Sequence, residues 1–246
     1  IGAGHAGVEA SIAAEKTGCS VGLITMDKNA IGRMSCNPAM GGTAKGHLVR
    51  EIDALGGVMG QIADKTGIQF KMLNTSKGPA VWSPRCQSDK NLYSAVAAEF
   101  IYEGKGIEVI QDLVRNLRVS EIKNKDGIYK YEIQGIETES GNEFDCKAVI
   151  ITSGTFLNAV MHTGKSQVEG GRIGEKSATG LSECMMKLGF ETGRLKTGTP
   201  PRLHYESIDF GVMEIQTGDA DPQPFSYKTD KGNFPIQKQV DCYLTH

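Results

Sequence analysis

The residues best suited to chemistry stand at the start of the chain, where Gly2, Gly4 and Gly7 fit the pattern G-x-G-x-x-G. In this pattern one glycine makes a tight turn, a second lets the backbone approach a pyrophosphate, and a third lets a helix pack close to a sheet. The phosphate then lies at the helix N-terminus, where N–H groups and the positive end of the helix dipole attract it. The string predicts a dinucleotide-binding turn, and the plain alternative is a structural glycine turn.

The segments that follow these glycines predict the helix and the strand that a dinucleotide-binding turn requires. Residues 8–17 are good helix formers and end at Gly18, and residues 21–26 predict a strand. Asp27 follows this strand, 20 residues beyond Gly7, where an acidic side chain can bond a ribose hydroxyl. We therefore predict a β-α-β unit that binds a dinucleotide through its first turn.

Cys36 is the second candidate for chemistry. It lies in residues 32–46, which are too rich in Gly and Pro to be regular structure and which lead into a helix predicted from His47. A thiolate is a strong nucleophile, and the positive end of a helix dipole favours it over the thiol. We predict that Cys36 is catalytic or touches a cofactor, and the alternative is a buried, inert cysteine. Three other cysteines fall in or beside predicted helices or strands and are expected in the core: Cys19, Cys146 and Cys184.

Composition sets the class of protein. The 246 residues suggest one large domain or two smaller ones, and the formal net charge of −2 gives no overall attraction to nucleic acid, so any basic surface must be local. The 6 cysteines form no C-x-x-C pair and the 5 histidines are dispersed, so we propose no metal site. No apolar run is long enough to cross a bilayer, and we expect a soluble, cytoplasmic protein. The chain starts inside a strand without Met and stops without a terminator, so we expect that both ends are cut.

The rest of the chain predicts an α/β fold. Helices are expected at residues 47–55, 58–63, 88–100 (with Ser88 as its N-cap) and 181–188, strands at residues 69–73 and 108–110, and irregular structure at residues 74–87. Residues 117–147 alternate in short segments with turns at 125–127 and 140–142, which is typical of an antiparallel insert. Residues 148–152 are uniformly apolar and predict a buried parallel strand that breaks at Gly154.

This order of elements resembles flavoproteins whose FAD domain is of the glutathione-reductase type, a Rossmann-like fold with a β-meander insertion. Five strings closely resemble the glucose-inhibited division protein A family: SCNPAMGG (35–42), KGHLV (45–49), DALGG (53–57), SKGPAV (76–81) and GRLKTGTPPR (193–202). The resemblance covers the whole chain. It departs from the family at Trp82, Ser83, Pro84 and Cys86, where many relatives carry other residues.

The resemblance implies an FAD-dependent enzyme that acts on tRNA. With a GTPase partner, the family adds a carboxymethylaminomethyl group to C5 of the wobble uridine, U34, of certain tRNAs. NADH serves as reductant, methylene-tetrahydrofolate as one-carbon donor and glycine as amine, and the family also implies a homodimer. Another flavin-dependent oxidoreductase, or a flavin-binding module without turnover, is the alternative, because one fold hosts many chemistries.

The resemblance also implies a domain organisation. Residues 1–157 are expected to form the FAD-binding domain, with the meander at about residues 117–147. Residues 158–246 are expected to be part of an inserted domain that is truncated at its C-terminus. The boundary near residue 157 marks where the sequence becomes rich in Gly and Pro.

The resemblance assigns FAD contacts to Gly2, Gly4, His5, Ala6, Gly7, Val114 and Ala178. We expect further cofactor contacts at Ala3, Asp27, Gly41, Gly42 and Gly154. Only the glycine set of the first turn has independent support from local physics. Val114 is better explained as a core residue. Gly41 and Gly42 either lend N–H groups to the flavin or its phosphates, or only keep the loop flexible.

Cations in and near the family-like loops are candidates for tRNA contact: Lys45, Lys77, Arg85, Arg194, Lys196 and Arg202. Each one alone is more simply explained as a solvated charge. Together they can form the local basic patch that the net charge hides.

Overall fold

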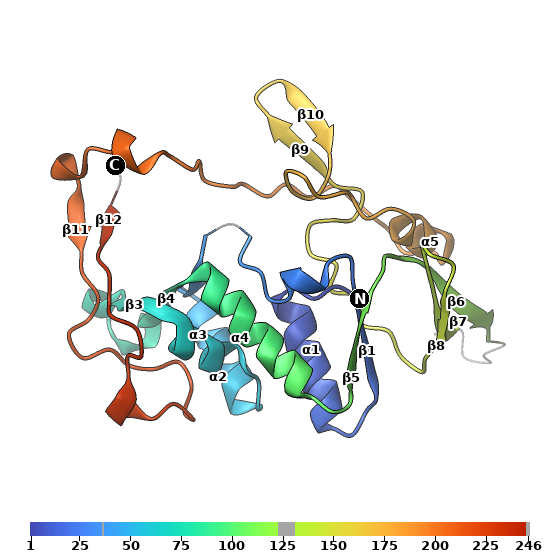
Figure 1. The fold of residues 1–246 in the computed structure, drawn as a ribbon, viewed down its shortest axis with the longest axis horizontal. Coiled ribbons are helices and arrows are strands. Elements are labelled where there is room, and N and C mark those ends of the chain that lie inside the picture. The colour runs from blue at the N-terminus through green and yellow to red at the C-terminus, as the bar shows by residue number, and fades with distance from the viewer. Residues whose placement is uncertain (36, 123–130, 245–246) are drawn as a thin grey trace. The chain divides into compact units, whose positions relative to one another are not determined.

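The computed structural model describes residues 1–35, 37–122 and 131–244 (Figure 1). Contacts within the described chain divide it into two compact units. Unit 1 holds residues 1–11, 20–30 and 106–197, and unit 2 holds residues 12–19, 31–105 and 198–246. Helix α1 (His5–Lys16) has residues in both units. The predicted domain boundary near residue 157 falls inside unit 1 and stays a prediction.

Unit 1 contains the strand that the sequence predicts after the first helix, in a parallel pair. Strands β1 (Val21–Thr25) and β5 (Ile107–Gln111) pair in parallel, with Val21 opposite Ile107 (Figure 1). Leu23 and Ile24 of β1 are buried, and Ile24 packs in one core cluster with Val114, Ile136 and Leu181. The parallel pairing and the burial of β1 confirm the α/β prediction.

The antiparallel insert is confirmed as a meander of three strands. Strands β6 (Val114–Glu121), β7 (Tyr131–Thr138) and β8 (Glu143–Asp145) lie in the order β6-β7-β8 (Figure 1). Arg118 of β6 joins the strands through ion pairs with Asp145 and with Glu143, whose Oε2 lies 3.1 Å from Nη1. The predicted turn at residues 125–127 lies outside the described residues.

The buried strand predicted at residues 148–152 is wrong in part. This segment forms no regular strand, and Ile150 is 55% exposed. Its backbone bonds to Ile1, because the Thr152 N–H donates to the Ile1 carbonyl at 2.8 Å and the Ile1 amino group donates to the Ile150 carbonyl at 2.8 Å. Two hydrogen bonds to one residue are too few to make a β-ladder. The prediction of burial failed because an apolar run does not by itself show which of its side chains other elements will cover.

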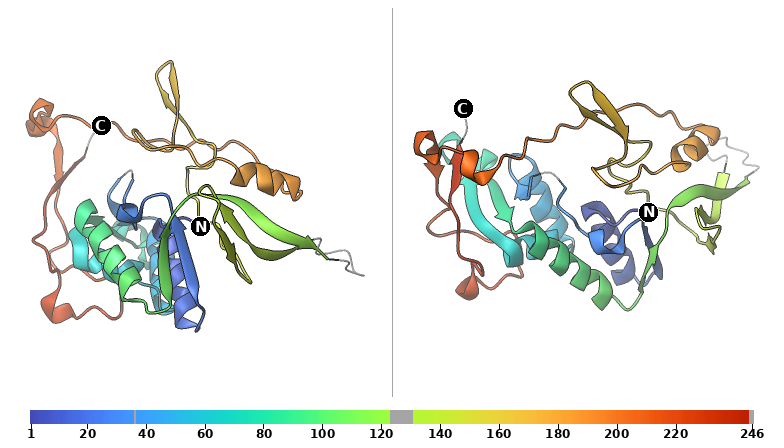
Figure 2. Two further views of the ribbon diagram at one scale, coloured as in Figure 1. Left: turned by 45° about the vertical axis from the view of Figure 1, so that its right-hand side comes forward. Right: turned by 45° about the horizontal axis from the view of Figure 1, so that its top comes forward.

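A hairpin and a short helix complete unit 1. Strands β9 (Val160–Thr163) and β10 (Ser166–Glu169) form the antiparallel hairpin, which is yellow in Figures 1 and 2. Helix α5 (Leu181–Lys187) agrees with the predicted helix at residues 181–188. No helix among the described residues is long and apolar enough to cross a membrane.

Unit 2 combines helices with a three-stranded sheet. Its helices are α2 (Lys45–Ala54), α3 (Met59–Thr66) and α4 (Lys90–Glu103), and its antiparallel sheet has the order β2 (Ala39–Gly41), β4 (Ser83–Ser88), β3 (Gly67–Leu73). The helices and β3 were predicted. Strands β2 and β4 lie in stretches predicted to be irregular, because their pairing with neighbouring strands overrides a composition rich in Gly and Pro.

In α2, Val49 and Asp53 lie on the buried face, whereas Leu48 is 55% exposed and the C-cap residue Leu55 is 90% exposed. One local expectation in unit 2 needs correction. The N-cap of α4 is Asp89, not Ser88, because Asp89 Oδ1 accepts from the N–H groups of Asn91 and Leu92 at 2.9 and 3.0 Å. A carboxylate at this position satisfies two donors, and Ser88 is left as the end of β4.

The remaining elements are short. Strands β11 (Glu214–Gln216) and β12 (Cys242–Leu244) pair antiparallel in unit 2. Single turns of 3-10 helix occur at η1 (Lys28–Ala30), η2 (Thr75–Lys77), η3 (Pro79–Val81), η4 (Tyr205–Ser207), η5 (Phe210–Val212) and η6 (Lys231–Asn233). The free edge of β3 is covered by this part of the chain, since the N–H groups of Asp219 and Val240 donate to the carbonyls of Phe70 and Ile68 at 2.8 and 2.7 Å.

A buried carboxylate holds residues 225–229 in unit 2. Asp64 is 1% exposed and accepts from the N–H groups of Phe225 and Ser226 at 2.8 and 2.9 Å and from the Thr229 hydroxyl at 2.6 Å. Burial raises the pKa of Asp64 above its ordinary value, and these donors oppose the shift. The segment therefore depends on one side chain for three of its hydrogen bonds.

Asp53 holds the same segment from α2. Its Oδ1 accepts from the Ser226 hydroxyl at 2.6 Å, and its Oδ2 accepts from the Tyr227 N–H at 3.0 Å. Asp53 is 4% exposed. Together the two carboxylates anchor a part of the chain that is distant in sequence, since the separations are 161 to 174 residues.

We predict that Asp64→Ala lowers the free energy of unfolding of the full chain by on the order of 3 kcal/mol, because three donors lose their acceptor in a buried place. Asp230→Ala is the matched control, since this exposed carboxylate accepts only in a local turn, from the Gly232 N–H at 3.0 Å and from Asn233. Its loss should cost less than about 1 kcal/mol. Urea denaturation followed by circular dichroism measures both, and equal midpoints for the two variants would contradict the role of Asp64.

Candidate dinucleotide-binding site

The first turn of the chain needs glycine at residues 2 and 7 for its own packing. Gly2 has a φ of +93°, and a Cβ there would lie 2.6 Å from the Thr152 carbonyl oxygen. A Cβ at Gly7 would overlap the carbonyl oxygen of Gly2. The Gly2 N–H donates to the Ile24 carbonyl of β1 at 2.8 Å, which ties the turn to the sheet. These two glycines are explained by strain and close approach alone.

Gly4 is different, because the protein itself leaves space at this residue. A Cβ at Gly4 would have no atom within 4 Å, and the residue is exposed at the tip of the turn. Its carbonyl accepts the Val8 N–H at 2.9 Å, the first bond of α1. The N–H groups of the first helical turn have no acceptor within the helix. The turn therefore offers an open, side-chain-free surface at a helix N-terminus, which fits a phosphate group.

Thr152 holds this turn by hydrogen bonds, and the sequence analysis did not identify this residue as part of the site. Its hydroxyl lies 2.8 Å from the Ile1 carbonyl and 2.9 Å from the Gly2 carbonyl and donates to them. The feature of the sequence that could have identified Thr152 is its place at the end of an apolar run, directly before Ser153 and the predicted break at Gly154. This residue links the far segment of unit 1 to the glycine turn.

His5 contributes no positive charge to the turn. Burial lowers the pKa of its imidazole below the ordinary value, so the ring is neutral at pH 7. Ala3 is 4% exposed, whereas Ala6 is exposed beside Gly4. Any anion at this turn is therefore attracted by backbone N–H groups and the helix dipole rather than by a side-chain cation.

Asp27 lies just past the end of β1, at the edge where parallel strands bind ligands. Its Oδ1 accepts from the Asn29 N–H at 2.8 Å, which begins the turn η1. The side chain is half-buried in unit 1, the unit that also holds the glycine turn. The location suits the predicted ribose contact, which stays a prediction.

The other predicted FAD residues of unit 1 have different environments. Val114 is 2% exposed inside the core cluster, which agrees with the preferred alternative. Ala178 is 6% exposed, and its N–H and carbonyl bond to Phe156 and Asn158 at 2.8 Å each. Gly154 has a φ of +60°, and a Cβ placed there would have no atom within 4 Å. Their contacts with a cofactor stay predictions.

Gly41 and Gly42 belong to unit 2. Gly41 has a φ of +86°, and a Cβ there would lie 2.7 Å from Cζ of Phe225. The Gly42 N–H donates to the Pro84 carbonyl at 2.8 Å, so unit 2 already uses this donor. Packing against Phe225 explains the glycine at residue 41, and a φ of +94° explains the glycine at residue 42. Their flavin contacts stay predictions.

The cysteines divide into reactive candidates and buried thiols. Cys36, the predicted catalytic residue, lies outside the described residues. Cys86 is fully buried, and burial raises its pKa to about 12. Cys184 is buried as predicted. Cys19 is exposed instead, because α1 ends at Lys16 and residues 17–20 after it are all exposed. Cys146 is half-buried.

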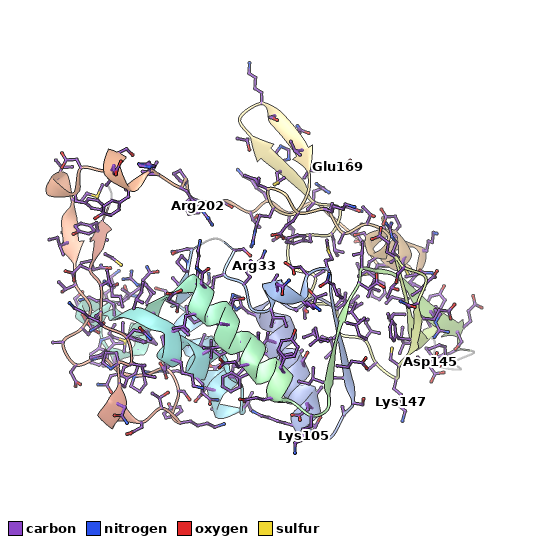
Figure 3. The ribbon with its side chains drawn as sticks, in the orientation of Figure 1. Arg33, Lys105, Asp145, Lys147, Glu169 and Arg202 are labelled. Atoms are coloured by element: carbon purple, nitrogen blue, oxygen red, sulfur yellow. The ribbon has the colours of Figure 1, made fainter. Side chains whose placement is uncertain are left out.

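The predicted tRNA cations are exposed, with one exception. The exposed ones are Lys45, Lys77, Arg194, Lys196 and Arg202, the last of which is labelled in Figure 3. Arg194 also donates to the Asn158 carbonyl at 2.7 Å. Arg85 is half-buried, and its guanidinium donates to two glutamine side chains. Among the described residues, no group of three or more His, Cys, Asp or Glu side chains is arranged to hold a metal ion.

Known proteins resemble this chain over its whole length. A sequence model of the family described as glucose inhibited division protein A matches residues 1–246. The chain is 47% identical over 246 residues to the tRNA uridine 5-carboxymethylaminomethyl modification enzyme MnmG of Cytophaga hutchinsonii, and 51% identical over 247 residues to the enzyme of that name from Thermodesulfovibrio yellowstonii. Each match covers 100% of this chain and 38% of the relative. The chain thus spans 38% of the length of these curated relatives.

Solved structures support the same relationship. The fold is similar to that of Aquifex aeolicus GidA in its form I crystal, with a TM-score of 0.89 and 43% identity over 99% of this chain and 40% of that chain. The GidA-related protein from Thermus thermophilus has a TM-score of 0.52 at 19% identity, over 77% of this chain and 67% of that chain, and shows likeness of fold alone.

We predict that Gly4→Val abolishes dinucleotide binding and leaves the fold intact. The new side chain has free space within the protein but fills the surface on which a pyrophosphate would lie. Gly7→Val should lose binding and stability together, because its side chain overlaps the Gly2 backbone. Bound flavin absorbance per protein and thermal unfolding, measured on the full-length protein, separate the two effects.

Gly22→Ala is the control for this experiment. Gly22 is exposed in β1, has ordinary backbone geometry, and its Cβ would make an ordinary contact 3.7 Å from Ile110. This variant should keep wild-type flavin content. A Gly4→Val protein with wild-type flavin content would show that the turn is not the cofactor site.

Proposed function

This chain belongs to the glucose inhibited division protein A family, and we propose that it is the FAD-binding part of an enzyme that adds a carboxymethylaminomethyl group to C5 of the wobble uridine, U34, of certain tRNAs. The observation that carries the proposal is the open space at Gly4, in a chain that the family matches from end to end. Packing does not require glycine there, whereas a bound pyrophosphate does. The two relatives named above carry this activity in their names.

The residues of unit 1 fit FAD as the cofactor. The first turn, residues 2–7, would hold the pyrophosphate through backbone N–H groups, and Asp27 would bond the ribose. When bound, FAD supplies reversible two-electron redox chemistry. In this proposal NADH is the reductant and methylene-tetrahydrofolate is the one-carbon donor.

The same proposal includes partners that the family uses. A GTPase subunit acts together with the enzyme, the enzyme is a homodimer, and the reaction takes place in the cytoplasm on tRNA. The region that the relatives have beyond this chain is expected to take part, since the chain spans 38% of their length. The chain alone is therefore expected to be inactive.

Cys36 is proposed as the nucleophile. Carbon C5 of uracil is a weak nucleophile until C6 is saturated, and addition of a thiolate at C6 places electron density on C5. Cys36 lies in the string SCNPAMGG, which leads through β2 into α2. By contrast, Cys86 is held as a thiol by its burial, so it is not a candidate.

The exposed cations are proposed to contact tRNA phosphates. Lys45 and Lys77 lie at the start of α2 and in η2, and Arg202 lies in an extended segment of unit 2 (Figure 3). Arg194 and Lys196 are exposed in unit 1. Phosphate contacts of this kind give affinity that falls as salt rises, because bound counterions are released.

We predict that Cys36→Ser in the full-length protein keeps FAD and tRNA binding and loses most of the modification activity, by about 100-fold or more. The assay measures modified wobble uridine with the GTPase partner present, after flavin content has been confirmed. Cys19→Ser is the control, because Cys19 is exposed and far from the predicted loop in sequence. Near-normal turnover of Cys36→Ser would remove its nucleophilic role, and loss of flavin would indicate a structural one.

We predict that Lys77→Glu combined with Arg202→Glu weakens tRNA binding and flattens the slope of log affinity against log salt by about 2, one for each lost phosphate contact. Lys105→Glu with Lys147→Glu is the control, since it changes the charge equally at exposed residues outside the family-like loops (Figure 3). An identical salt slope in both double variants would place the RNA contacts elsewhere.

A further inference from the structure

Arg85 is a partly buried cation with no carboxylate partner among the described residues. It lies in β4, paired in register with Gly41 of β2 on one side and with Lys71 of β3 on the other. Its Nη2 donates to Oε1 of Gln69 at 2.8 Å and to Oε1 of Gln216 at 2.7 Å. Both acceptors are neutral, and the buried Nε finds no hydrogen-bond partner in the described chain.

The neighbouring charges leave this cation unbalanced. Lys71 forms its own ion pair, with Nζ 3.3 Å from Oδ1 of Asp219. Strand β2 adds no side chain beside Arg85, because the paired residue is Gly41. Lys71, Arg85 and Asp219 together carry a charge of +1, from two cations and one anion. Withdrawing a guanidinium from water without a counter-ion costs free energy, and a bound oxyanion offsets that cost.

The guanidinium is also held in one orientation before any ligand arrives. Gln69 is 1% exposed, and its Nε2 donates to the carbonyls of Gln216 at 2.8 Å and Val240 at 3.2 Å. These bonds fix the Gln69 amide, so its Oε1 must face Arg85. An arginine fixed in this way presents its remaining N–H groups in a planar array, which matches the geometry of a carboxylate better than a lysine does.

We propose that Arg85 binds the carboxylate of the aminoacetate unit that the enzyme attaches to uridine, that is, of glycine before transfer. This inference rests on the proposed function. The group named in the relatives, carboxymethylaminomethyl, ends in a carboxylate. The enzyme has to hold that anion while it binds tRNA, whose phosphates repel it. An arginine reserved for a small carboxylate meets this requirement.

The position of Arg85 favours a small anion over the tRNA backbone. The five other candidate cations are exposed, as contacts with a large polyanion require, whereas Arg85 is partly buried in a sheet between two glutamines. Its paired residue Gly41 follows Cys36 by five residues in the sequence, within the string that carries the proposed nucleophile. The proposed nucleophile therefore precedes β2 in the same string, and the proposed carboxylate site lies on β4, the strand that pairs with β2.

The test measures the KM for glycine in the full-length, FAD-loaded enzyme with its GTPase partner and tRNA. Arg85→Gln should raise the KM for glycine by about 10-fold or more, and Arg85→Lys should raise it less, because the charge stays and the planar fork is lost. The Kd for tRNA should not change in either variant. Lys71→Gln is the matched control, a charge loss on the neighbouring strand that should leave the KM for glycine unchanged.

Each outcome of this test is decisive. An unchanged KM for glycine in Arg85→Gln overturns the proposal, and a weaker Kd for tRNA with an unchanged KM assigns Arg85 to a phosphate instead. If Arg85→Gln loses flavin or unfolds at a lower temperature, the KM for glycine of Arg85→Lys alone decides, and an unchanged KM in that variant overturns the proposal. If the wild-type enzyme modifies no uridine, the proposed function has failed, and equilibrium dialysis of labelled glycine against wild type and Arg85→Lys then tests the carboxylate site separately.

Discussion

The contact between Gly7 and the backbone of Gly2 is the constraint on which unit 1 depends. The first turn of α1 approaches the Gly2 carbonyl so closely that a side chain at residue 7 would overlap it. Gly2 bonds to β1, and the Thr152 hydroxyl bonds to the carbonyls of Ile1 and Gly2. The helix, the strand and the distant segment that contains Thr152 therefore meet at one turn. Because every contact is made by backbone or by a small side chain, the tip at Gly4 is left bare for a ligand.

Unit 2 is organised differently, by buried polar side chains that bridge distant parts of the chain. Asp64 and Asp53 bond to residues 225–229, and Gln69 bonds to the carbonyls of Gln216 and Val240. Such contacts add little net stability when they are complete, but each becomes costly when one partner is lost. They specify one arrangement of the segment. The aromatic ring of Phe225, held by this network, packs against Gly41 and so fixes the end of β2.

Local patterns in the sequence were sufficient for the elements whose cause is local. The glycine turn, α1, β1 and the meander follow from spacing, helix formers and alternation, and the structure confirms them. Strands β2 and β4 were missed, because only pairing with β3 makes a regular strand of sequence rich in Gly and Pro. The exposure of Ile150 was missed for the same kind of reason, since an apolar pattern does not say what covers it.

The charged residues show most clearly what the sequence alone does not predict, namely which cations the fold pairs with carboxylates. A net charge of −2 and a list of cations in family-like loops treat every lysine and arginine alike. The fold then pairs Lys71 with Asp219 and Arg118 with Glu143, while Arg85 faces neutral amides, one of them 131 residues away in the chain. A cation that the fold neutralises contributes to structure, whereas one that it orients and leaves without a carboxylate is available to a ligand. Which cation is available is therefore decided by tertiary pairing, and it can be read only after the sheet and its covering segments have been placed.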